Sequence, residues 1–189
     1  MGHAVALGSG LVGRFVIERL LEANHSVTVI DLHVPEAFHS NPQVTVCEGD
    51  ALAHIASLKP NQIVINMLPG RIGDAVRPEL LRGGHQIVDL AFTAEDPHRH
   101  QNLATAHGSV LLWDVGIAPG ISNMLVKQAY DEFGPLDSVS IKVGGNPVEM
   151  DNSWSYMAPF SPSDVIEEYT RPARIKVDGV VVELSLIHI

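Results

Sequence analysis

Short hydrophobic runs, many of them β-branched, alternate along residues 1–113 with segments whose apolar positions recur at helical spacing. This alternation is typical of β–α–β units and favours an α/β fold with a doubly wound parallel sheet. The predicted strands cover residues 3–7, 26–30, 43–47, 62–66, 86–90 and 110–113. The predicted helices between them cover residues 11–23, 51–58, 73–82 and 95–107.

The pattern also predicts which side chains face the interior. Residues 63–65 and 110–112 are continuously apolar, as expected for strands that are covered on both faces. Pro78 falls inside the third helical segment, so this helix is expected to be kinked or to begin late. The first helix has four apolar residues that we expect to pack against the sheet: Leu11, Phe15, Leu20 and Leu21.

The pattern changes near residue 120. Beyond it we expect a helix over residues 121–133, strands over 138–143 and 153–157, and a short helix over 164–169. A hairpin follows over residues 173–177 and 180–184, because Asp178-Gly179 is a favoured two-residue turn. We therefore expect one domain over residues 1–120. Residues 121–183 are too few for a core of their own and are interpreted as the beginning of a mixed α/β domain whose remainder is absent.

Residues 184–189 resemble the translation of a sequencing adapter and end in an apolar run with no cap or turn. We expect them to be a non-native tail. The alternative is an ordinary final strand.

Composition narrows the functional class. The chain is 46% hydrophobic and 18% charged, which excludes global disorder, and its formal net charge is −10. Such an acidic protein is repelled by nucleic acid and by anionic membranes, so neither is expected as a partner. Cys47 is the only cysteine, which fits a reducing compartment. No apolar run is long enough to cross a bilayer, and a cytoplasmic location is expected.

A glycine motif follows the first predicted strand and opens the first helix. Gly8, Gly10 and Gly13 form Gly-x-Gly-x-x-Gly, with Ser9, Leu11 and Val12 between them. In a dinucleotide-binding turn, the first glycine allows the tight turn and the second admits the diphosphate to the backbone. The third lets the helix pack closely on the strand. The diphosphate then meets free N–H groups at the positive end of the helix. The motif thus predicts a Rossmann domain.

Asp31 ends the second predicted strand, 23 residues after Gly8, where a ribose-binding acid is expected. Its carboxylate would accept hydrogen bonds from a ribose 2′-hydroxyl and repel a 2′-phosphate, so NAD is favoured over NADP. His33 would soften this preference if it were protonated. The alternative is a structural glycine turn, with Asp31 merely closing the strand.

Two later turns fit the same pocket. Asp50, followed by Ala51, is placed to accept from an adenine amino group, although capping of the next helix explains Asp50 equally well. Asn66, Leu68 and Pro69 follow the fourth strand at the carboxyl edge, where such sheets bind ligands. A plain Pro-Gly turn is the alternative there. No metal site is expected, because the nearest histidines, His98 and His100, diverge on a helix and the chain has no His-Glu-x-x-His motif.

Three further stretches carry a resemblance to a known family. They are Asp-x-Gly-x-x-Pro-Gly-x-x-Asn over residues 114–123, Gly-Gly-Asn-Pro over 144–147, and the segment 161–174. With the opening turn, they resemble the saccharopine dehydrogenase family, most closely its bacterial lysine 6-dehydrogenase-like branch.

The resemblance implies a Rossmann domain followed by a mixed α/β domain for substrate binding and dimerisation. It further implies hydride transfer between NAD, or less favourably NADP, and the CH–NH group of an amino acid of the saccharopine or lysine type. A homodimer and turnover are expected of a full-length parent rather than of this shorter chain. The alternative is a catalytically inactive module that binds or senses NAD.

The same resemblance suggests catalytic residues. Gly120 and Asn123 open a predicted helix whose N–H groups can bind a carboxylate or the nicotinamide amide. Asp89 and Asp114 end strands at the open edge, where either can interact with the substrate ammonium or relay its proton. For both acids, fixing a loop or capping a helix is the ordinary alternative.

Overall fold

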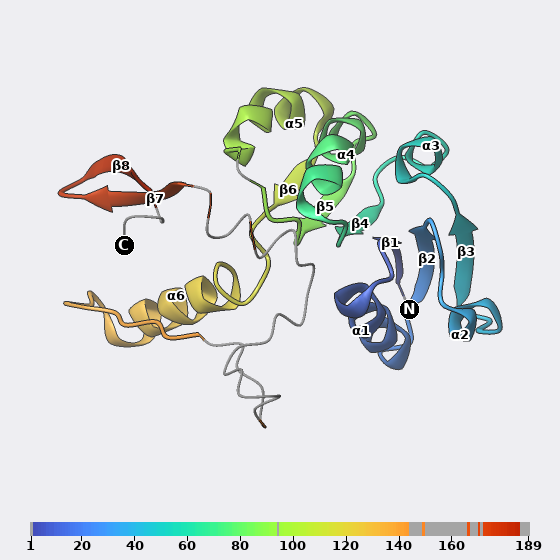
Figure 1. Ribbon diagram of the computed structural model, residues 1–189, viewed down its shortest axis with the longest axis horizontal. Coiled ribbons are helices and arrows are strands. Elements are labelled where there is room, and N and C mark those ends of the chain that lie inside the picture. Colours follow the sequence, from blue (N-terminus) through green and yellow to red (C-terminus); the bar gives the residue numbers. More distant parts are fainter. Residues whose placement is uncertain are drawn as a thin grey trace. The chain divides into compact units, whose positions relative to one another are not determined.

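The computed structural model describes residues 2–93, 95–143, 149, 166, 170 and 172–185. Contacts between Cα atoms divide the chain into two units, Met1–Ile141 and Lys142–Ile189 (Figure 1). The first unit contains every element that concerns the candidate site.

A parallel sheet of six strands forms the centre of the first unit. Its order is β3–β2–β1–β4–β5–β6. The strands are β1 (His3–Leu7), β2 (Ser26–Asp31), β3 (Val44–Glu48), β4 (Ile63–Asn66), β5 (Gln86–Asp89) and β6 (Val110–Leu112). The direction of winding reverses between β1 and β4, which is the arrangement of the Rossmann fold. The predicted α/β class is therefore confirmed.

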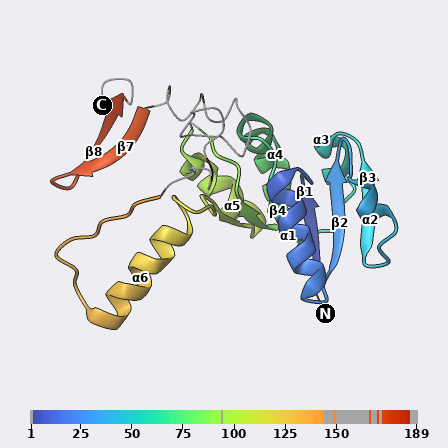
Figure 2. The ribbon, with the colours of Figure 1, turned by 60° about the horizontal axis from the view of Figure 1, so that its bottom comes forward.

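Helices cover the two faces of this sheet (Figure 1). The helices are α1 (Leu11–Glu22), α2 (Glu36–His39), α3 (Ala51–Ile55), α4 (Gly70–Arg82), the 3-10 turn η1 (Pro97–His100), α5 (Gln101–His107) and α6 (Ile121–Phe133). α1 and α2 lie on one face, and α3, α4 and α5 lie on the other. Figure 2 shows α1 running along β1 and β2.

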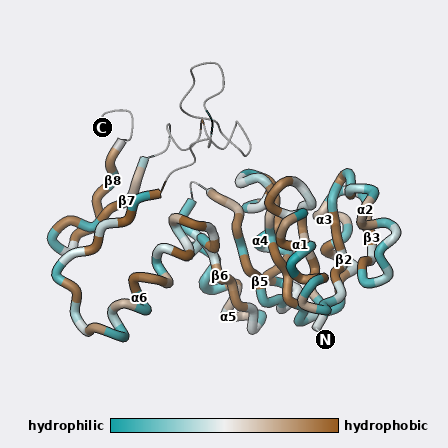
Figure 3. Tube along the Cα trace, turned by 90° about the horizontal axis from the view of Figure 1, so that it is seen from below, coloured by the Kyte–Doolittle hydropathy of each residue, from teal (hydrophilic) through white to brown (hydrophobic). Residues whose placement is uncertain are grey.

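Each face has its own core because successive strand residues point to opposite sides. Val5 and Leu7 of β1 pack with Val64 and with Leu80 of α4, whereas Ala6 packs on the opposite face. The second core also contains the buried residues Ile17, Val27, Val29, Val34 and Phe38. Figure 3 shows hydrophobic stretches along the strands of the sheet and along α6.

The predicted inner face of α1 is correct at Leu20 and Leu21, which pack against the core, and wrong in the first half of the helix. Leu11 and Phe15 are 78% and 60% exposed, while Gly13 and Ile17 are buried. Gly13 has no side chain, so α1 approaches the sheet most closely along the line of this residue. Ile17, one turn later, therefore points inward, and Leu20 and Leu21 are only partly buried.

Three other predictions also need correction. α4 begins at Gly70, earlier than predicted, because Pro69 ends the preceding turn in an extended conformation that permits a helix directly after it. Val110 and Leu112 of β6 are about half exposed, since β6 is the last strand of the sheet. Residues 138–143 form no strand, because no neighbouring strand among the described residues pairs with them.

The second unit contains the predicted hairpin, formed by β7 (Pro172–Val177) and β8 (Val180–Ser185). Asp178 and Gly179 join the strands with φ angles of 49° and 84°, both in the left-handed region that this turn requires. Leu184, the first residue of the predicted tail, pairs with Ala173. The predicted strand 153–157 and most of the predicted helix 164–169 lie outside the described residues. None of the helices in the described part of the chain is long and apolar enough to span a membrane.

Candidate functional site

The turn between β1 and α1 has a geometry that only glycine permits at two positions. Gly8 has a φ of 92°, and its N–H donates to the carbonyl of Ile30 at 2.9 Å. A Cβ on Gly13 would lie 2.2 Å from the carbonyl oxygen of Gly8, which is far inside van der Waals contact. These findings confirm the steric roles predicted for Gly8 and Gly13.

Gly10 precedes α1, and no side chain caps the helix there. A Cβ on Gly10 would meet no atom within 4 Å, so the space in front of the helix is open. The first main-chain bond of the helix runs from the N–H of Arg14 to the carbonyl of Gly10. The preceding N–H groups, those of Leu11, Val12 and Gly13, lack partners within the helix and point to this open space. This combination suits an anion such as a diphosphate.

Asp31 lies beside this turn, at the end of β2. Its Oδ2 accepts hydrogen bonds from the N–H of Ser9 at 2.5 Å and from the Ser9 hydroxyl at 2.7 Å. Ser9 is 4% exposed, whereas Asp31 is half-buried. Because both bonds use one oxygen, the carboxylate is fixed in orientation while Oδ1 can still accept from a ribose hydroxyl. The structure thus brings Asp31 and the glycine turn together, as the sequence predicted.

The turn after β3 is more ordinary. Asp50 caps α3, and its side chain accepts from the N–H of Leu52 at 3.0 Å. Ala51 is buried in the core. The capping interpretation of Asp50 is therefore confirmed, and a contact with adenine stays a prediction.

Asn66, at the end of β4, shapes the next turn from inside. It is fully buried, its Nδ2 donates to the carbonyl of Gly73 at 3.1 Å, and its Oδ1 accepts from the N–H of Leu68 at 3.4 Å. Leu68 packs against the core, and Pro69 precedes α4. These residues position the main chain at the carboxyl edge, next to Gly8, whose missing Cβ would lie 3.0 Å from the carbonyl oxygen of Met67.

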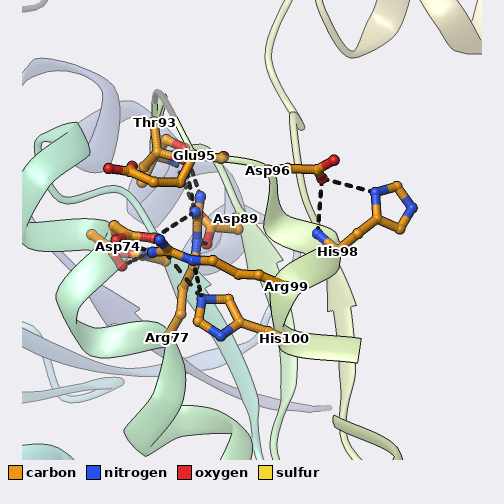
Figure 4. A network of polar contacts seen from close by, with 12 residues as sticks. Asp74, Arg77, Asp89, Thr93, Glu95, Asp96, His98, Arg99 and His100 are labelled. Carbon is orange, nitrogen blue, oxygen red and sulfur yellow. Dashed lines mark hydrogen bonds and ion pairs between the residues drawn. The ribbon is translucent and has the colours of Figure 1, made fainter. Parts of the chain in front are cut away.

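Asp89, a candidate for proton transfer, is fully buried in an ion pair. Its Oδ2 accepts from Nε of Arg77 at 2.6 Å, and its Oδ1 accepts from the N–H of Ala91 at 2.7 Å (Figure 4). Both oxygens are thus engaged in holding the segment that follows β5. This geometry favours the loop-fixing interpretation of Asp89 over the catalytic one.

The segment after β6 carries the remaining candidates. Asp114 is half-buried and has a φ of 57°. Gly120 has a φ of 131°, and a Cβ there would lie 2.1 Å from the carbonyl oxygen of Gly116. Asn123 Oδ1 accepts from the N–H of Gly120 at 3.0 Å, which stabilises the first turn of α6. The loop is joined to the end of β5 by a bond from the N–H of Val115 to the carbonyl of Asp89.

The sequence analysis missed Arg77, Gly70 and Gly73. Arg77 is 1% exposed, and Gly70 and Gly73 bring the first turn of α4 against residues 91 and 92. A signal was present, because Gly73 and Arg77 are four residues apart and so share a helix face. An arginine on the sheet side of a helix is rare, and the pattern alone gave no partner for it.

Burial shifts two histidine pKa values in this unit. The pKa of His85 is lowered by burial, and its Nδ1 accepts from the N–H of Gln62. The pKa of His100 is lowered by burial and by the nearby Arg99 and Arg77 cations, against an opposing effect of Asp74. In the described part of the chain, no group of three or more possible ligands is arranged to hold a metal ion.

Comparison with known proteins by sequence finds a family model and distant relatives. A family model described as "Saccharopine dehydrogenase C-terminal domain" matches residues 116–188. The mitochondrial alpha-aminoadipic semialdehyde synthase of Mus musculus is 25% identical over 195 residues, covering 96% of this chain and 21% of the relative. The alpha-aminoadipic semialdehyde synthase of Arabidopsis thaliana is 21% identical over 129 residues, covering 65% of this chain and 12% of the relative.

Among solved structures, an apo saccharopine dehydrogenase (L-Glu forming) from Saccharomyces cerevisiae superposes with a TM-score of 0.65 at 19% identity. The match covers 98% of this chain and 44% of that one. At this identity the likeness shows the fold. The chain spans about a fifth of the length of the mouse relative.

The sheet order and the glycine turn define a protein of the Rossmann class. The match over residues 116–188 and the mouse relative show that the chain is similar to proteins of the saccharopine dehydrogenase family.

Proposed function

We propose that this chain binds NAD at the carboxyl edge of its sheet. The observation that carries the proposal is the open space in front of α1, with the Asp31 carboxylate held beside it by Ser9. The diphosphate would lie against the first N–H groups of α1, and the adenosine ribose would bond to Asp31.

The charge at Asp31 favours NAD over NADP. A 2′-phosphate would meet a carboxylate that two hydrogen bonds fix in place. The next residues, Leu32 and His33, include no lysine or arginine to offset this repulsion. The discrimination is therefore electrostatic and acts at a single position.

The reaction we propose is hydride transfer at the CH–NH group of an amino acid of the saccharopine or lysine type. When bound, NAD supplies the hydride acceptor: the amine carbon loses a hydride, the C–N bond becomes an imine, and one proton is released. The likeness of residues 116–188 to a saccharopine dehydrogenase domain supports this reaction class.

The residues that would serve this chemistry lie after β6. Gly120 precedes α6, and the first N–H groups of this helix, those of Ile121 and Ser122, already donate to the carbonyls of Gly116 and Ile117. The main chain there is therefore not open to a substrate carboxylate, and Asn123 holds the turn in place. We assign the released proton to Asp114, which is half-buried in the loop after β6.

Two measurements test the proposed function. Isothermal titration calorimetry should show saturable binding of NADH by this chain. A longer protein that contains this chain should reduce NAD when lysine or saccharopine is added, and the absorbance of the reduced nicotinamide measures the rate. Absence of NADH binding would contradict the cofactor proposal. NADH binding with no turnover of any amine would favour the inactive, sensing module.

A further inference from the structure

The segment after β5 is held by two buried side chains, those of Arg77 and Asp89. Arg77 of α4 donates from Nη2 to the carbonyl of Ala91 at 2.9 Å and from Nη1 to the hydroxyl of Thr93 at 2.8 Å. Its Nε donates to Asp89, which in turn accepts from the N–H of Ala91. Nη1 also donates to Asp74 at 3.1 Å. Figure 4 shows the guanidinium close to Asp74, Asp89 and Thr93. One planar cation therefore orients the carbonyl of Ala91 and the hydroxyl of Thr93.

Two glycines in α4 allow the same segment to pack closely against the helix, because they have no side chains. A Cβ on Gly70 would lie 2.0 Å from the carbonyl oxygen of Phe92, and a Cβ on Gly73 would lie 2.3 Å from the Cβ of Ala91. The segment therefore lies directly on the first turn of α4, which follows the turn after β4. It forms a wall at the carboxyl edge between β4 and β5.

The order of the strands in the sheet indicates which part of the cofactor would contact residues 90–93. Asp31 on β2 would bind the adenosine ribose, and the turn after β1 would bind the diphosphate. The second nucleoside must then extend in the opposite direction, over β4 and β5. Residues 90–93 thus lie at the nicotinamide end.

The Arg77–Asp89 ion pair is better suited to fixing the conformation of residues 90–93 than to increasing the free energy of unfolding. Burying two charges costs about as much desolvation free energy as their attraction returns, so an apolar pair of similar size can be equally stable. An apolar pair, however, does not fix the direction of the Ala91 carbonyl or of the Thr93 hydroxyl. The guanidinium fixes both.

We propose, on the basis of the proposed NAD binding, that Arg77 is a positioning residue: it holds residues 90–93 as the wall that receives the nicotinamide half of the cofactor. Arg77 acts through this segment and touches no reacting atom.

The test compares two ligands, NADH and ADP-ribose, because ADP-ribose lacks the nicotinamide. The variants are Arg77→Lys, which keeps the charge but not the planar fork, and the double variant Arg77→Met/Asp89→Leu, which leaves no unpaired buried charge. Arg99→Met is the matched control. Arg99 is exposed, and it donates to Asp74 and His100 of the same cluster rather than to the segment that Arg77 holds.

By calorimetric titration, both Arg77 variants should bind NADH about tenfold more weakly or worse, with ADP-ribose affinity unchanged within about twofold. Arg99→Met should change neither affinity. The positioning role would be overturned if the Arg77 variants lost affinity for NADH and ADP-ribose to the same extent, or if their NADH affinity were unchanged. Failure of both Arg77 variants to fold would overturn it as well. If the unaltered chain bound neither ligand, the proposed function itself would fail, and this inference with it.

Discussion

Gly10 and Gly13 lie in the same motif but constrain the molecule differently. A methyl group on Gly13 collides with the main chain of Gly8, whereas a methyl group on Gly10 enters open space. We therefore expect Gly13→Ala to lower the free energy of unfolding by about 1–3 kcal/mol. Gly10→Ala should change it by no more than about 0.5 kcal/mol and still weaken NADH binding about tenfold, because the new methyl group occupies the diphosphate position.

Urea denaturation and NADH titration of both variants provide the check. The two effects should separate, with Gly13→Ala losing stability and Gly10→Ala losing only affinity. Normal NADH binding by Gly10→Ala would mean that no diphosphate approaches the helix at this point.

His85 gives the protein a stability that depends on pH. Its ring is 1% exposed, its Nδ1 accepts from Gln62, and burial lowers the pKa of the ring below 6.5. The unfolded chain therefore takes up a proton at a higher pH than the folded one. The stabilising contribution is complete above pH about 6.5 and is lost as pH falls from there through the lower folded pKa.

The variant His85→Asn tests this. Its amide oxygen can still accept from Gln62 but does not titrate, so the free energy of unfolding should fall less steeply between about pH 7 and pH 5 than in the unaltered protein. Urea denaturation at several pH values measures the slopes. Equal slopes would show that His85 does not contribute to the acid sensitivity.

At the scale of elements, the two faces of α1 contribute differently to the free energy of unfolding. Ile17 is fully buried, and Phe15 is 60% exposed with the Arg19 guanidinium 5.4 Å from its ring centroid. Ile17→Ala should therefore lower the free energy of unfolding by about 2–4 kcal/mol. Phe15→Ala should cost less than about 1 kcal/mol. Urea denaturation of both variants measures the two losses. A larger loss for Phe15→Ala than for Ile17→Ala would mean that the helix packs with the face predicted from sequence.

The six strands of the parallel sheet could be predicted from sequence because each is a short apolar run bounded by turn residues. The turn after β1 and the hairpin at Asp178-Gly179 were equally accessible, since both need left-handed residues that the sequence supplies. The orientation of α1 could not be predicted in this way, because a pattern of apolar positions does not include Gly13. Yet the absent side chain of Gly13 determines where the helix meets the sheet.

The candidate site was predicted only in part, for a related reason. Ser9 and Asp31 could be paired because a motif and a known spacing link them. Arg77 and Asp89 lie on separate elements, and no periodicity links a buried cation to its acceptor. The sequence therefore left proton transfer and loop fixing as equal alternatives for Asp89, and only the structure shows that its two oxygens hold a loop.

At the scale of the whole molecule, the first unit presents one continuous binding edge. The turns after β2, β1, β4 and β5 follow one another along the carboxyl edge in the order of the sheet. In our proposal, an elongated dinucleotide contacts them in that order, with its ribose at Asp31 and its nicotinamide at residues 90–93. A chain with a net charge of −10 attracts such an anion only through local groups, which are the N–H groups of α1.

The central claim is tested most directly by titrating NADH and NADPH against the unaltered chain and Asp31→Asn. The amide keeps an acceptor for Ser9 but removes the negative charge that faces the ribose. We predict tighter binding of NADH than of NADPH by the unaltered chain, and a difference that narrows at least about tenfold in the variant. Equal binding of the two cofactors by the unaltered chain, or an identical preference in the variant, would contradict the account.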